Sequence, residues 1–582
     1  MSTLCALLLG ACGGESDAPA PASAPPAGAA EASAPPRVEL PTPRRALQGV
    51  TRNEGLAEVV TDWLIALAQK VQIRDFDGMR GWFTEDFQGE DPWASAQGAA
   101  GARTEDLPLG VQRTKFADLA SGVFGRDAFV DQVAGHIGDW QRVTQAQIKL
   151  LSVVFEDAKR VEWGRAQIKL HIVGERAEGG FDSLTAKGEA KLVNIEGEWR
   201  IALLRIDSRE RLARDSASYS EVSRATGVAY DGPAFGAPGN DTVAWNGAAS
   251  ADVDGDGRFD IFVPSGLRSF LYLNRGDGTF SEEAEARGLA ADVGGTGAVF
   301  FDFDRDGDQD LAVGHIGWVG LERSLGGAPL ALYENDGRGH FREVAAERGF
   351  DKRLAAYTLT VFDADGDGWQ DVYACGYGRM EVEANDSWIR ASNGESDLFL
   401  RNVEGRFVDA TKEAGFGDSG WSYASAAADF DADGDQDLFV ANNFGPCQLW
   451  RNRGDGTFED VAKELGVDAA GIVMGCNWAD LNHDGHLDLY LSSPTSVAGS
   501  RMLAHLDLDG RDRAAANLRQ HAIGNRIFFG DDRGGFSELP AGHGAASAGW
   551  GFGAAMTDLD LDGALDIACV NGFVTGDLTA DT

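Results

Sequence analysis

The chain of 582 residues carries 51 Lys and Arg against 92 Asp and Glu, which gives a formal net charge of -41 at pH 7. This excess of acid disfavours nucleic acid as a partner, because phosphate binding needs a basic surface. The length allows two or three domains, and 43% hydrophobic residues with 76 glycines suit many short strands joined by tight turns.

The first 12 residues predict a lipoprotein signal, and residues 13–48 predict a tether. "MSTLCALLLGAC" has a short apolar core ending in Leu-Gly-Ala-Cys, which resembles a bacterial lipobox with Cys12 as the lipidated residue. The core is far too short to span a bilayer. No Lys or Arg precedes it, and an arbitrary apolar N-terminus is the alternative. The Pro/Ala-rich segment that follows is typical of a tether that holds a domain off a membrane.

These features predict a protein of the bacterial cell envelope, lipid-anchored, facing the periplasm or the outside, and touching the membrane only through that anchor. Four further cysteines are compatible with such a compartment. They are either buried strand residues or include one disulfide, and their spacing gives no zinc signature. The four are Cys375, Cys447, Cys476 and Cys569.

Residues 49–212 predict a separate α+β domain. "GLAEVVTDWLIALAQKV" and "RDAFVDQVAGHIGDW" have the periodicity of amphipathic helices, and extended runs follow near 148–155, 166–173, 183–194 and 199–206. Helices followed by an antiparallel meander indicate the α+β class. The order of elements and the ending "GEWRIALLRI" resemble the cone-shaped NTF2-like fold.

Cones of this kind sometimes house enzymes, and His171 is the obvious acid/base candidate in this domain. Along "AQIKLHIVG" it alternates onto the face of Gln167 and Lys169, so we expect it on the solvated face. The tryptophans of the domain are expected in its core rather than on a ligand platform. These are Trp63, Trp82 and Trp199.

Residues 219–582 contain an aspartate-rich motif, first seen in "DFDADGDQD" at Asp429 to Asp437. Carboxylates at positions one, three and five, glycine at six and aspartate at nine match the opening of an EF-hand loop. An EF-hand needs its last ligand at position twelve and helical flanks, whereas this loop lies between two apolar strand-like runs. The motif therefore predicts a strand, a calcium loop and a second strand.

The motif occurs six times, at a period expected of a repeat protein. The predicted calcium ligands at positions one, three, five and nine are Asp252, Asp254, Asp256 and Asp260; Asp302, Asp304, Asp306 and Asp310; Asp363, Asp365, Asp367 and Asp371; Asp429, Asp431, Asp433 and Asp437; Asp480, Asn482, Asp484 and Asp488; and Asp558, Asp560, Asp562 and Asp566.

About six bound Ca2+ are expected, with a main-chain carbonyl at position seven as a further ligand. Unscreened carboxylates a few ångströms apart repel one another, and the cation relieves this repulsion. Each loop uses its ligands to close its own turn, so a structural role is favoured over a catalytic one. Asn482 keeps an oxygen but removes a charge, which predicts a weaker fifth site.

A second element repeats in phase with the loops. "LYLNRGDGTFSEEAEARGL", "LYENDGRGHFREVAAERGF", "LFLRNVEGRFVDATKEAGF" and "LWRNRGDGTFEDVAKELGV" each predict a hairpin, and a weaker copy starts at Ile527. Two strands around calcium plus this hairpin make a four-stranded blade. The pattern resembles the FG-GAP or VCBS repeats of integrin-like β-propellers and, within them, bacterial proteins similar to cartilage acidic protein. The resemblance implies a mainly β fold, a calcium-binding β-propeller preceded by the smaller domain.

Six blades are visible, whereas the family favours seven, so either one blade lacks the motif or the ring has six. The last calcium loop has no hairpin after it, and "YSEVSRATGV" at Tyr219 to Val228 looks like the end of a hairpin with no loop before it. We expect this segment to supply an outer strand to the blade that holds Asp558 and so to close the ring.

Function is expected on the face opposite the calcium loops, where the longer connections lie at 376–397 and 492–525. Aromatic and amide residues near the start of such connections are the candidate ligand face. They are His315, Trp318, Tyr377, Trp388, Asn442, Asn443 and Asn571. The pattern favours a surface-anchored adhesion or recognition protein that binds a protein or a glycan.

Two alternatives stay open. One is a calcium-dependent carbohydrate-active enzyme, a polysaccharide lyase or hydrolase, for which His315, Asp386 and Glu395 lie in suitable loops. The other is a structural component of the envelope. No nucleophile elbow, phosphate-cradling glycine loop or HExxH zinc motif is found, so no catalytic residue is assigned.

Overall fold

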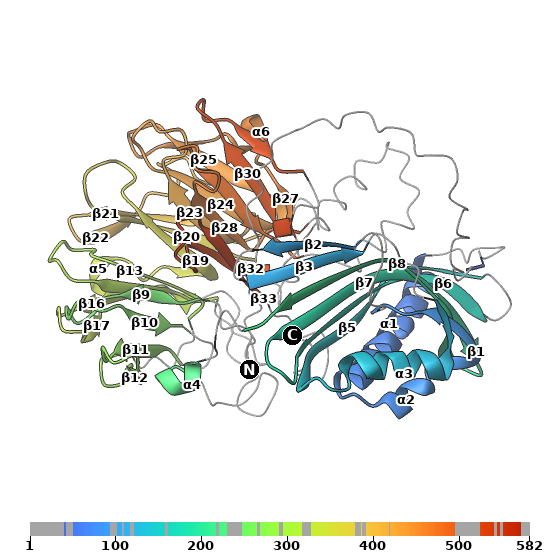
Figure 1. The fold of residues 1–582 in the computed structure, drawn as a ribbon. Coiled ribbons are helices and arrows are strands. Elements are labelled where there is room, and N and C mark those ends of the chain that lie inside the picture. The colour runs from blue at the N-terminus through green and yellow to red at the C-terminus, as the bar shows by residue number, and fades with distance from the viewer. Residues whose placement is uncertain are drawn as a thin grey trace, which may run out of the picture. The chain divides into compact units, whose positions relative to one another are not determined.

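The computed structural model describes residues 40–41, 50–93, 102–107, 110–116, 122–156, 161–216, 220, 222–229, 247–264, 268–289, 295–316, 328–378, 386, 391–417, 420–494, 524–540, 544–546 and 551–571. They fall into two compact units, an α+β unit up to residue 220 and a repeat unit from residue 222 onward (Figure 1). The lipobox with Cys12 lies outside the described residues, and so does the tether apart from residues 40–41. Among the described helices, none is long and apolar enough to cross a membrane.

In the described part of the α+β unit, three helices accompany one sheet of eight strands. Four long strands form the predicted antiparallel meander, and β1 adds to β8 in parallel. The helices are α1 (Val50–Gln72), α2 (Phe76–Arg80) and α3 (Arg126–Ile137); the strands are β1 (Phe83–Glu90), β2 (Ala102–Leu107), β3 (Val111–Phe116), β4 (Val123–Gly125), β5 (Arg142–Phe155), β6 (Trp163–Glu175), β7 (Phe181–Ile195) and β8 (Glu198–Arg214).

One face of this sheet makes the core with α1 and α3, because the apolar positions of the helices and the alternate positions of the strands face each other. The core predictions for the tryptophans are confirmed: Trp199 is buried, and Trp63 and Trp82 pack against the same cluster. His171 lies on the other face beside Lys169, as predicted. It is partly buried rather than fully solvated, and its Nδ1 lies 2.9 Å from the Thr185 hydroxyl.

The described residues of the repeat unit form five antiparallel sheets, each built on four strands, plus a two-stranded sheet that follows them in the chain. The first five are β9 (Ala249–Ala251), β10 (Asp260–Val263), β11 (Phe270–Asn274) and β12 (Phe280–Glu282); β13 (Gly297–Phe301), β14 (Asp310–Gly314), β16 (Ala331–Asn335) and β17 (Phe341–Glu343); β19 (Ala356–Phe362), β20 (Asp371–Gly376), β21 (Leu398–Val403) and β22 (Arg406–Asp409); β23 (Trp421–Ala428), β24 (Asp437–Pro446), β25 (Gln448–Asn452) and β26 (Phe458–Asp460); and β28 (Gly475–Ala479), β29 (Asp488–Ser492), β30 (Arg526–Gly530) and β31 (Phe536–Glu538).

The last sheet pairs β32 (Gly551–Thr557) with β33 (Asp566–Asn571). Smaller elements decorate the repeats: β15 (Ala328–Pro329) pairs with β18 (Arg353–Leu354), and β27 (Ala470–Ile472) adds to β24. Helical turns α5 (Ala345–Arg348) and α6 (Ala462–Leu465) follow the second and fourth hairpins, and a 3-10 turn covers Gly544–Ala546.

Successive sheets meet through their first strands, β9, β13, β19, β23, β28 and β32 in chain order. Side-chain hydroxyls tie these strands together. Thr296 Oγ1 donates to Ala356 O at 2.6 Å, and Thr358 Oγ1 donates to Tyr423 O at 2.8 Å. Apolar residues of neighbouring sheets fill the space between them in separate clusters rather than in one common core. Each repeat therefore buries its faces against the repeats before and after it.

The predicted closing strand is not seen among the described residues of 219–228. They form a helical turn, α4 (Ser223–Thr226), followed by Gly227 with φ of 84°. A Cβ at Gly227 would lie 2.7 Å from Phe280 O, as one at Gly349 would from Phe407 O. The turn α4 thus packs on β12 of the first described sheet in the same way that α5 packs on β22 of the third. Closure of the ring and the number of blades stay predictions.

The four cysteines of the repeat unit are free. Cys375, Cys447 and Cys476 are buried and Cys569 is partly buried, which agrees with the first of the two alternatives for these residues. Burial raises the pKa of the Cys447 thiol to about 12, so it behaves as a small apolar side chain.

Candidate functional site

The aspartate motif forms one and the same tight loop six times, between the first and second strands of each sheet. Positions four and six have positive φ in all six copies, which a tight reversal requires. Position six is always glycine. Position four also accommodates Arg305, Ala432, His483 and Leu561, with φ between 58° and 62°. The shared strain shows that the spacing of the motif encodes a fixed backbone conformation.

The carboxylate at position one holds the turn. In the first loop, Asp252 accepts hydrogen bonds from the main-chain nitrogens of Asp256 at 3.0 Å and Gly257 at 2.8 Å. The bond from the glycine nitrogen is present in every copy. Position one is therefore a structural residue of the loop as well as a candidate ligand.

The carboxylate at position nine begins the second strand and is buried in the first five loops, whereas Asp566 of the sixth is only partly buried. Asp310 accepts from Phe303 N at 3.2 Å and from Asn335 N at 2.8 Å. Burial raises the pKa of Asp310 to about 8, and it raises the pKa of Asp371 and of Asp437 to about 7. Without a cation, a negative charge at these positions is costly.

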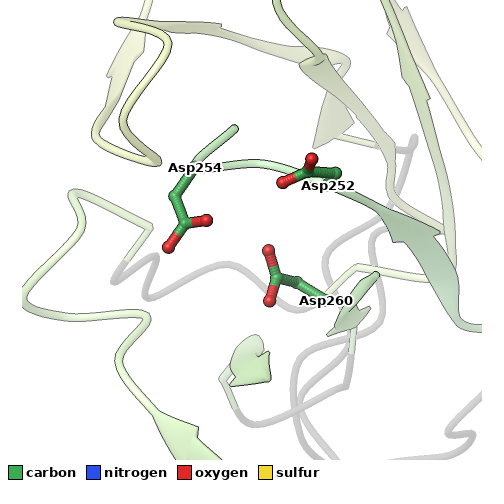
Figure 2. Close-up of side chains that lie close together, drawn as sticks. All are labelled: Asp252, Asp254 and Asp260. Carbon is green, nitrogen blue, oxygen red and sulfur yellow. The ribbon is translucent and has the colours of Figure 1, made fainter. Parts of the chain in front are cut away.

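Carboxylate oxygens of three aspartates converge in five of the six loops. In the first loop, Asp252, Asp254 and Asp260 point toward a common centre (Figure 2), with oxygens within 4.8 Å of one another. The other groups are Asp302, Asp304 and Asp306; Asp363, Asp365 and Asp371; Asp429, Asp431 and Asp437; and Asp558, Asp560 and Asp562. An all-oxygen set of this kind suits a hard cation such as Ca2+.

Position three provides the test of whether a cation fits. One oxygen of Asp304, Asp365 and Asp431 faces an arginine of the same repeat, with N–O distances between 3.1 and 3.4 Å. The other oxygen of each, and Oδ1 of Asp254, is buried and has no hydrogen-bond partner. Burial, and then the carboxylate at position five, raises the pKa of all four. Buried acceptors without a donor are what a bound Ca2+ would satisfy.

The fifth loop departs from the others. Asn482 Nδ2 donates to Asp484 Oδ2 at 2.9 Å, and Asn482 Oδ1 accepts from Asp484 N at 3.0 Å. Its side chain is thus satisfied by its own loop, and the fifth loop is not among the groups of three converging carboxylates. This local bonding supports the prediction of a weaker site.

Two features of the loops were missed by sequence reasoning. Asp308 occupies position seven of the second loop, where only a carbonyl was expected. Its Oδ1 is buried without a partner, and burial with the neighbouring aspartates raises its pKa to about 6. The second feature is an asparagine at the end of the third strand, whose side chain donates hydrogen bonds to main-chain carbonyls of the loops. It stands in each of the four quoted hairpin sequences, so its repetition was a usable signal.

The candidate ligand face is not an exposed surface where it is described. His315, Tyr377, Asn442 and Asn443 are all at most 5% exposed, and Asn443 Nδ2 donates to the Tyr377 hydroxyl at 3.0 Å. Tyr377 packs in an aromatic cluster with Tyr357, Tyr423 and Trp421. Because all four residues are buried, they do not form the exposed surface that was expected. Trp318 and Trp388 lie outside the described residues, and of Asn571 only the main chain, in β33, is described.

The acids considered for the enzyme alternative are engaged locally. Glu395 accepts from Ala355 N at 2.7 Å, and Asp386 accepts from the nitrogen and the hydroxyl of Ser392, both at 2.8 Å. His315 is buried. Both carboxylates thus accept hydrogen bonds from nearby groups of the protein. The described residues give no distance that would make an acid/base pair of these side chains.

The α+β unit contains a partly open pocket of about 60 Å³ with an entirely apolar lining. Helices α1 and α3 and strands β5 to β8 contribute, together with Pro92 and Trp93 after β1. His136 stacks on Trp93 with ring centroids 5.6 Å apart, and its Nε2 lies 3.3 Å from Oδ2 of the buried Asp91. Asp91 and His136 are 45 residues apart in the sequence and belong to no recognised motif, so the pair was not predicted.

Comparison with known proteins identifies the repeats. Residues 252–313 and 429–491 match the family model described as FG-GAP-like repeat, and each match begins at the first aspartate of a loop. The chain therefore contains FG-GAP-like repeats. It is 25% identical to human cartilage acidic protein 1 over 345 residues, 56% of this chain and 47% of that protein. It is 29% identical to the Xenopus tropicalis protein of the same name over 213 residues, 36% of this chain and 30% of that protein.

The chain spans less than half the length of these relatives. Among solved structures, an Agrocybe aegerita lectin that recognises non-reducing terminal N-acetylglucosamine aligns with 69% of this chain and 92% of its own, at 16% identity and a TM-score of 0.30. A protein of unknown function from Mycobacterium tuberculosis aligns with 28% of this chain and 76% of its own, at 16% identity and a TM-score of 0.18. These scores are too low to assign a fold or a function from either structure.

Proposed function

We propose that the repeat unit is a calcium-stabilised β-propeller that acts as a rigid scaffold for binding a protein or glycan ligand. The observation that carries the calcium part is the row of buried, unpartnered oxygens at position three in four successive loops. A cation in each loop would hold positions one, three, five and nine together and neutralise their charge. Contacts between the first strands of all six described sheets support the propeller, since such strands surround the axis of that fold.

The ends of the sheets opposite the calcium loops are the proposed binding side. Connections between the second and third strands emerge there, and their lengths differ greatly. Pro446 and Gln448 are separated by one residue, whereas β29 ends at Ser492 and β30 begins at Arg526. Variable connections on a regular scaffold are where recognition usually resides. We propose that the lipid anchor at Cys12 displays this scaffold at the bacterial cell envelope.

Calorimetric titration of Ca2+ into metal-stripped protein lacking residues 1–12 tests the calcium part. About six sites, together with a rise in melting temperature, are expected. Asp304→Ala, which leaves no side-chain oxygen at position three, should remove one site, and Asp336→Ala, which changes an exposed hairpin aspartate outside the loops, should remove none. Fewer than three sites, or a melting temperature that EDTA leaves unchanged, would contradict the proposal.

The binding part is tested separately on a glycan array and on envelope protein fractions. The calcium-loaded protein is compared with a variant in which residues 495–523 are replaced by a short Gly-Ser linker. Binding that is lost in the linker variant while its calcium-dependent melting transition is kept supports recognition by the connections. Equal binding by both proteins would move the ligand site elsewhere.

A second candidate function belongs to the α+β unit, and the apolar pocket favours it. A pocket lined by apolar side chains favours small apolar molecules over water. We propose that it binds a small hydrocarbon group, with the Asp91 and His136 pair available to a polar end. A melting-temperature increase with benzene or indole that disappears in Ala186→Leu supports this function. No shift with either compound would count against it.

A further inference from the structure

Neighbouring calcium loops are joined by one asparagine side chain at the end of the third strand of a sheet. Asn402 Nδ2 donates to Gln370 O, at position eight of its own loop, at 3.1 Å, and to Phe303 O, at position two of the preceding loop, at 2.8 Å. Its side chain is 1% exposed. Both hydrogens of the amide are thus used, one on each of two loops.

The same bridge occurs in the repeats on either side. Asn335 Nδ2 donates to Val253 O at 2.9 Å and to Gln309 O at 3.0 Å. Asn452 Nδ2 donates to Ala364 O at 2.8 Å and to Gln436 O at 3.1 Å. The three bridges join the first loop to the second, the second to the third and the third to the fourth.

These bridges are continuous with the candidate ligands. The main-chain nitrogen of Asn402 donates to Asp371 at 2.7 Å, and the nitrogen of Phe303 donates to Asp310 at 3.2 Å. A buried hydrogen-bonded path therefore runs from the position-nine carboxylate of one loop, through Phe303 and Asn402, to that of the next. Repeated three times, it links Asp260, Asp310, Asp371 and Asp437 in series.

The series ends at the fifth loop. Gly530 stands where the asparagine is expected: its nitrogen donates to Asp488 at 3.0 Å, and it has no side chain to reach the fourth loop. A Cβ at Gly530 would lie 2.4 Å from Leu487 O, so the backbone there excludes any larger residue.

We propose that these asparagines couple calcium binding between neighbouring loops, so that the first four loops fill cooperatively while the fifth fills independently of the fourth. The inference rests on the proposed calcium binding. A cation that fixes the position-nine carboxylate of one loop also orders the residue at position two, whose nitrogen donates to that carboxylate. The carbonyl of this residue accepts from the asparagine, whose own nitrogen donates to the position-nine carboxylate of the next loop. Coupling of this kind is reciprocal, so each filled loop raises the affinity of every loop to which an asparagine joins it.

A double-mutant cycle tests the bridge at Asn402. Terbium replaces calcium, because Trp369 at position seven of the third loop can sensitise its luminescence; the signal lost in Trp369→Phe belongs to that loop. Asp302→Asn is used to weaken the second loop. It should lower terbium affinity at the third loop about fivefold or more, within the usual range for coupled sites. In the Asn402→Ala background the same change should lower it less than about twofold.

Asn274→Ala is the matched control, because Nδ2 of Asn274 donates to its own loop, at Phe259 O. It should leave the coupling between the second and third loops intact. Asn402→Asp keeps the size of the side chain and the acceptor for Gly405 N while losing both donors, and it serves where Asn402→Ala fails to fold. Circular dichroism and a cooperative melt confirm folding of each variant.

A rival path exists, since the Arg305 guanidinium of the second loop lies over the Trp369 ring at 5.1 Å. If the effect of Asp302→Asn persists in Asn402→Ala, the asparagine bridge is overturned. If the effect of Asp302→Asn on the third loop is lost in Arg305→Ala but kept in Asn402→Ala, the coupling belongs to the stacked pair of Arg305 and Trp369. This outcome also overturns the asparagine bridge. If no variant or wild-type protein binds terbium or calcium, the proposed calcium function itself has failed. Binding without coupling refutes only the inference made here.

Discussion

The hydroxyl of Tyr373 donates a 2.6 Å hydrogen bond to Oδ2 of Asp397, a carboxylate that is only 5% exposed. Asp397 also accepts from Gly376 N at 2.6 Å and from the Ser422 hydroxyl at 2.8 Å, so it joins two neighbouring sheets. A buried charge is tolerated only when its hydrogen bonds are complete.

Tyr373→Phe should therefore lower the free energy of unfolding by about 1–3 kcal/mol, the usual cost of losing a bond to a buried charge. Urea unfolding in excess calcium measures it. Ser422→Ala should have a smaller effect of the same sign, and the double variant should be non-additive because both donors share Asp397. A change below about 0.3 kcal/mol for Tyr373→Phe would show that Asp397 is satisfied in another way.

Position nine should matter for folding even without calcium. Asp310→Ala leaves the buried nitrogens of Phe303 and Asn335 without their acceptor, which should cost about 2–4 kcal/mol in EDTA. Asp306→Ala, at the exposed position five of the same loop, should cost less than about 1 kcal/mol under the same conditions. Denaturant unfolding in EDTA compares the two. Equal losses would mean that position nine acts only as a ligand.

The six loops could be predicted from sequence because their conformation is encoded locally, by the spacing of Asp252 to Asp260 and its copies. The burial of Tyr377 and Asn443 could not, since it depends on which sheets lie beside them. Alternation also placed His171 on the right face, whereas β2 and β4, of six and three residues, are too short to carry such a periodic signal. The role of Asn402 depends on a carbonyl 99 residues away, at Phe303.

The fifth loop should gain calcium affinity from Asn482→Asp. The added carboxylate restores the position-three ligand, and the amide that now bonds Asp484 is removed. We expect at least about a fivefold gain in affinity at this site and, because four carboxylates then repel one another, a lower melting temperature in EDTA.

Calorimetry with Ca2+ and thermal melts in EDTA provide the two measurements. His483→Asp is the matched control, because it adds the same charge at position four, where no ligand is expected. It should reproduce the lower stability in EDTA without the gain in affinity. If His483→Asp raised the affinity equally, the gain would be a general effect of charge rather than a new ligand.

The α+β unit should lose stability as the pH falls from about 6.5 to about 4, and His171 is the cause. Burial, together with Lys169 and Lys149, lowers the pKa of its imidazole from 6.5 to about 4. The residues opposite His171 on the two neighbouring strands are Gln147 and Thr185, so no acid directly opposite offsets the positive charge of a protonated His171. Between these pH values the unfolded chain binds a proton that the folded unit does not, so folding is favoured at the higher pH.

Urea unfolding of the α+β transition should thus give a free energy about 2 kcal/mol lower at pH 4.5 than at pH 7.5 on account of His171. His171→Gln keeps a polar group for the Thr185 hydroxyl but cannot titrate, and it should remove most of this difference. His136→Gln, at another partly buried histidine of the same unit, serves as the control and should leave this difference in place. An unchanged pH dependence in His171→Gln would assign the loss of stability to other groups.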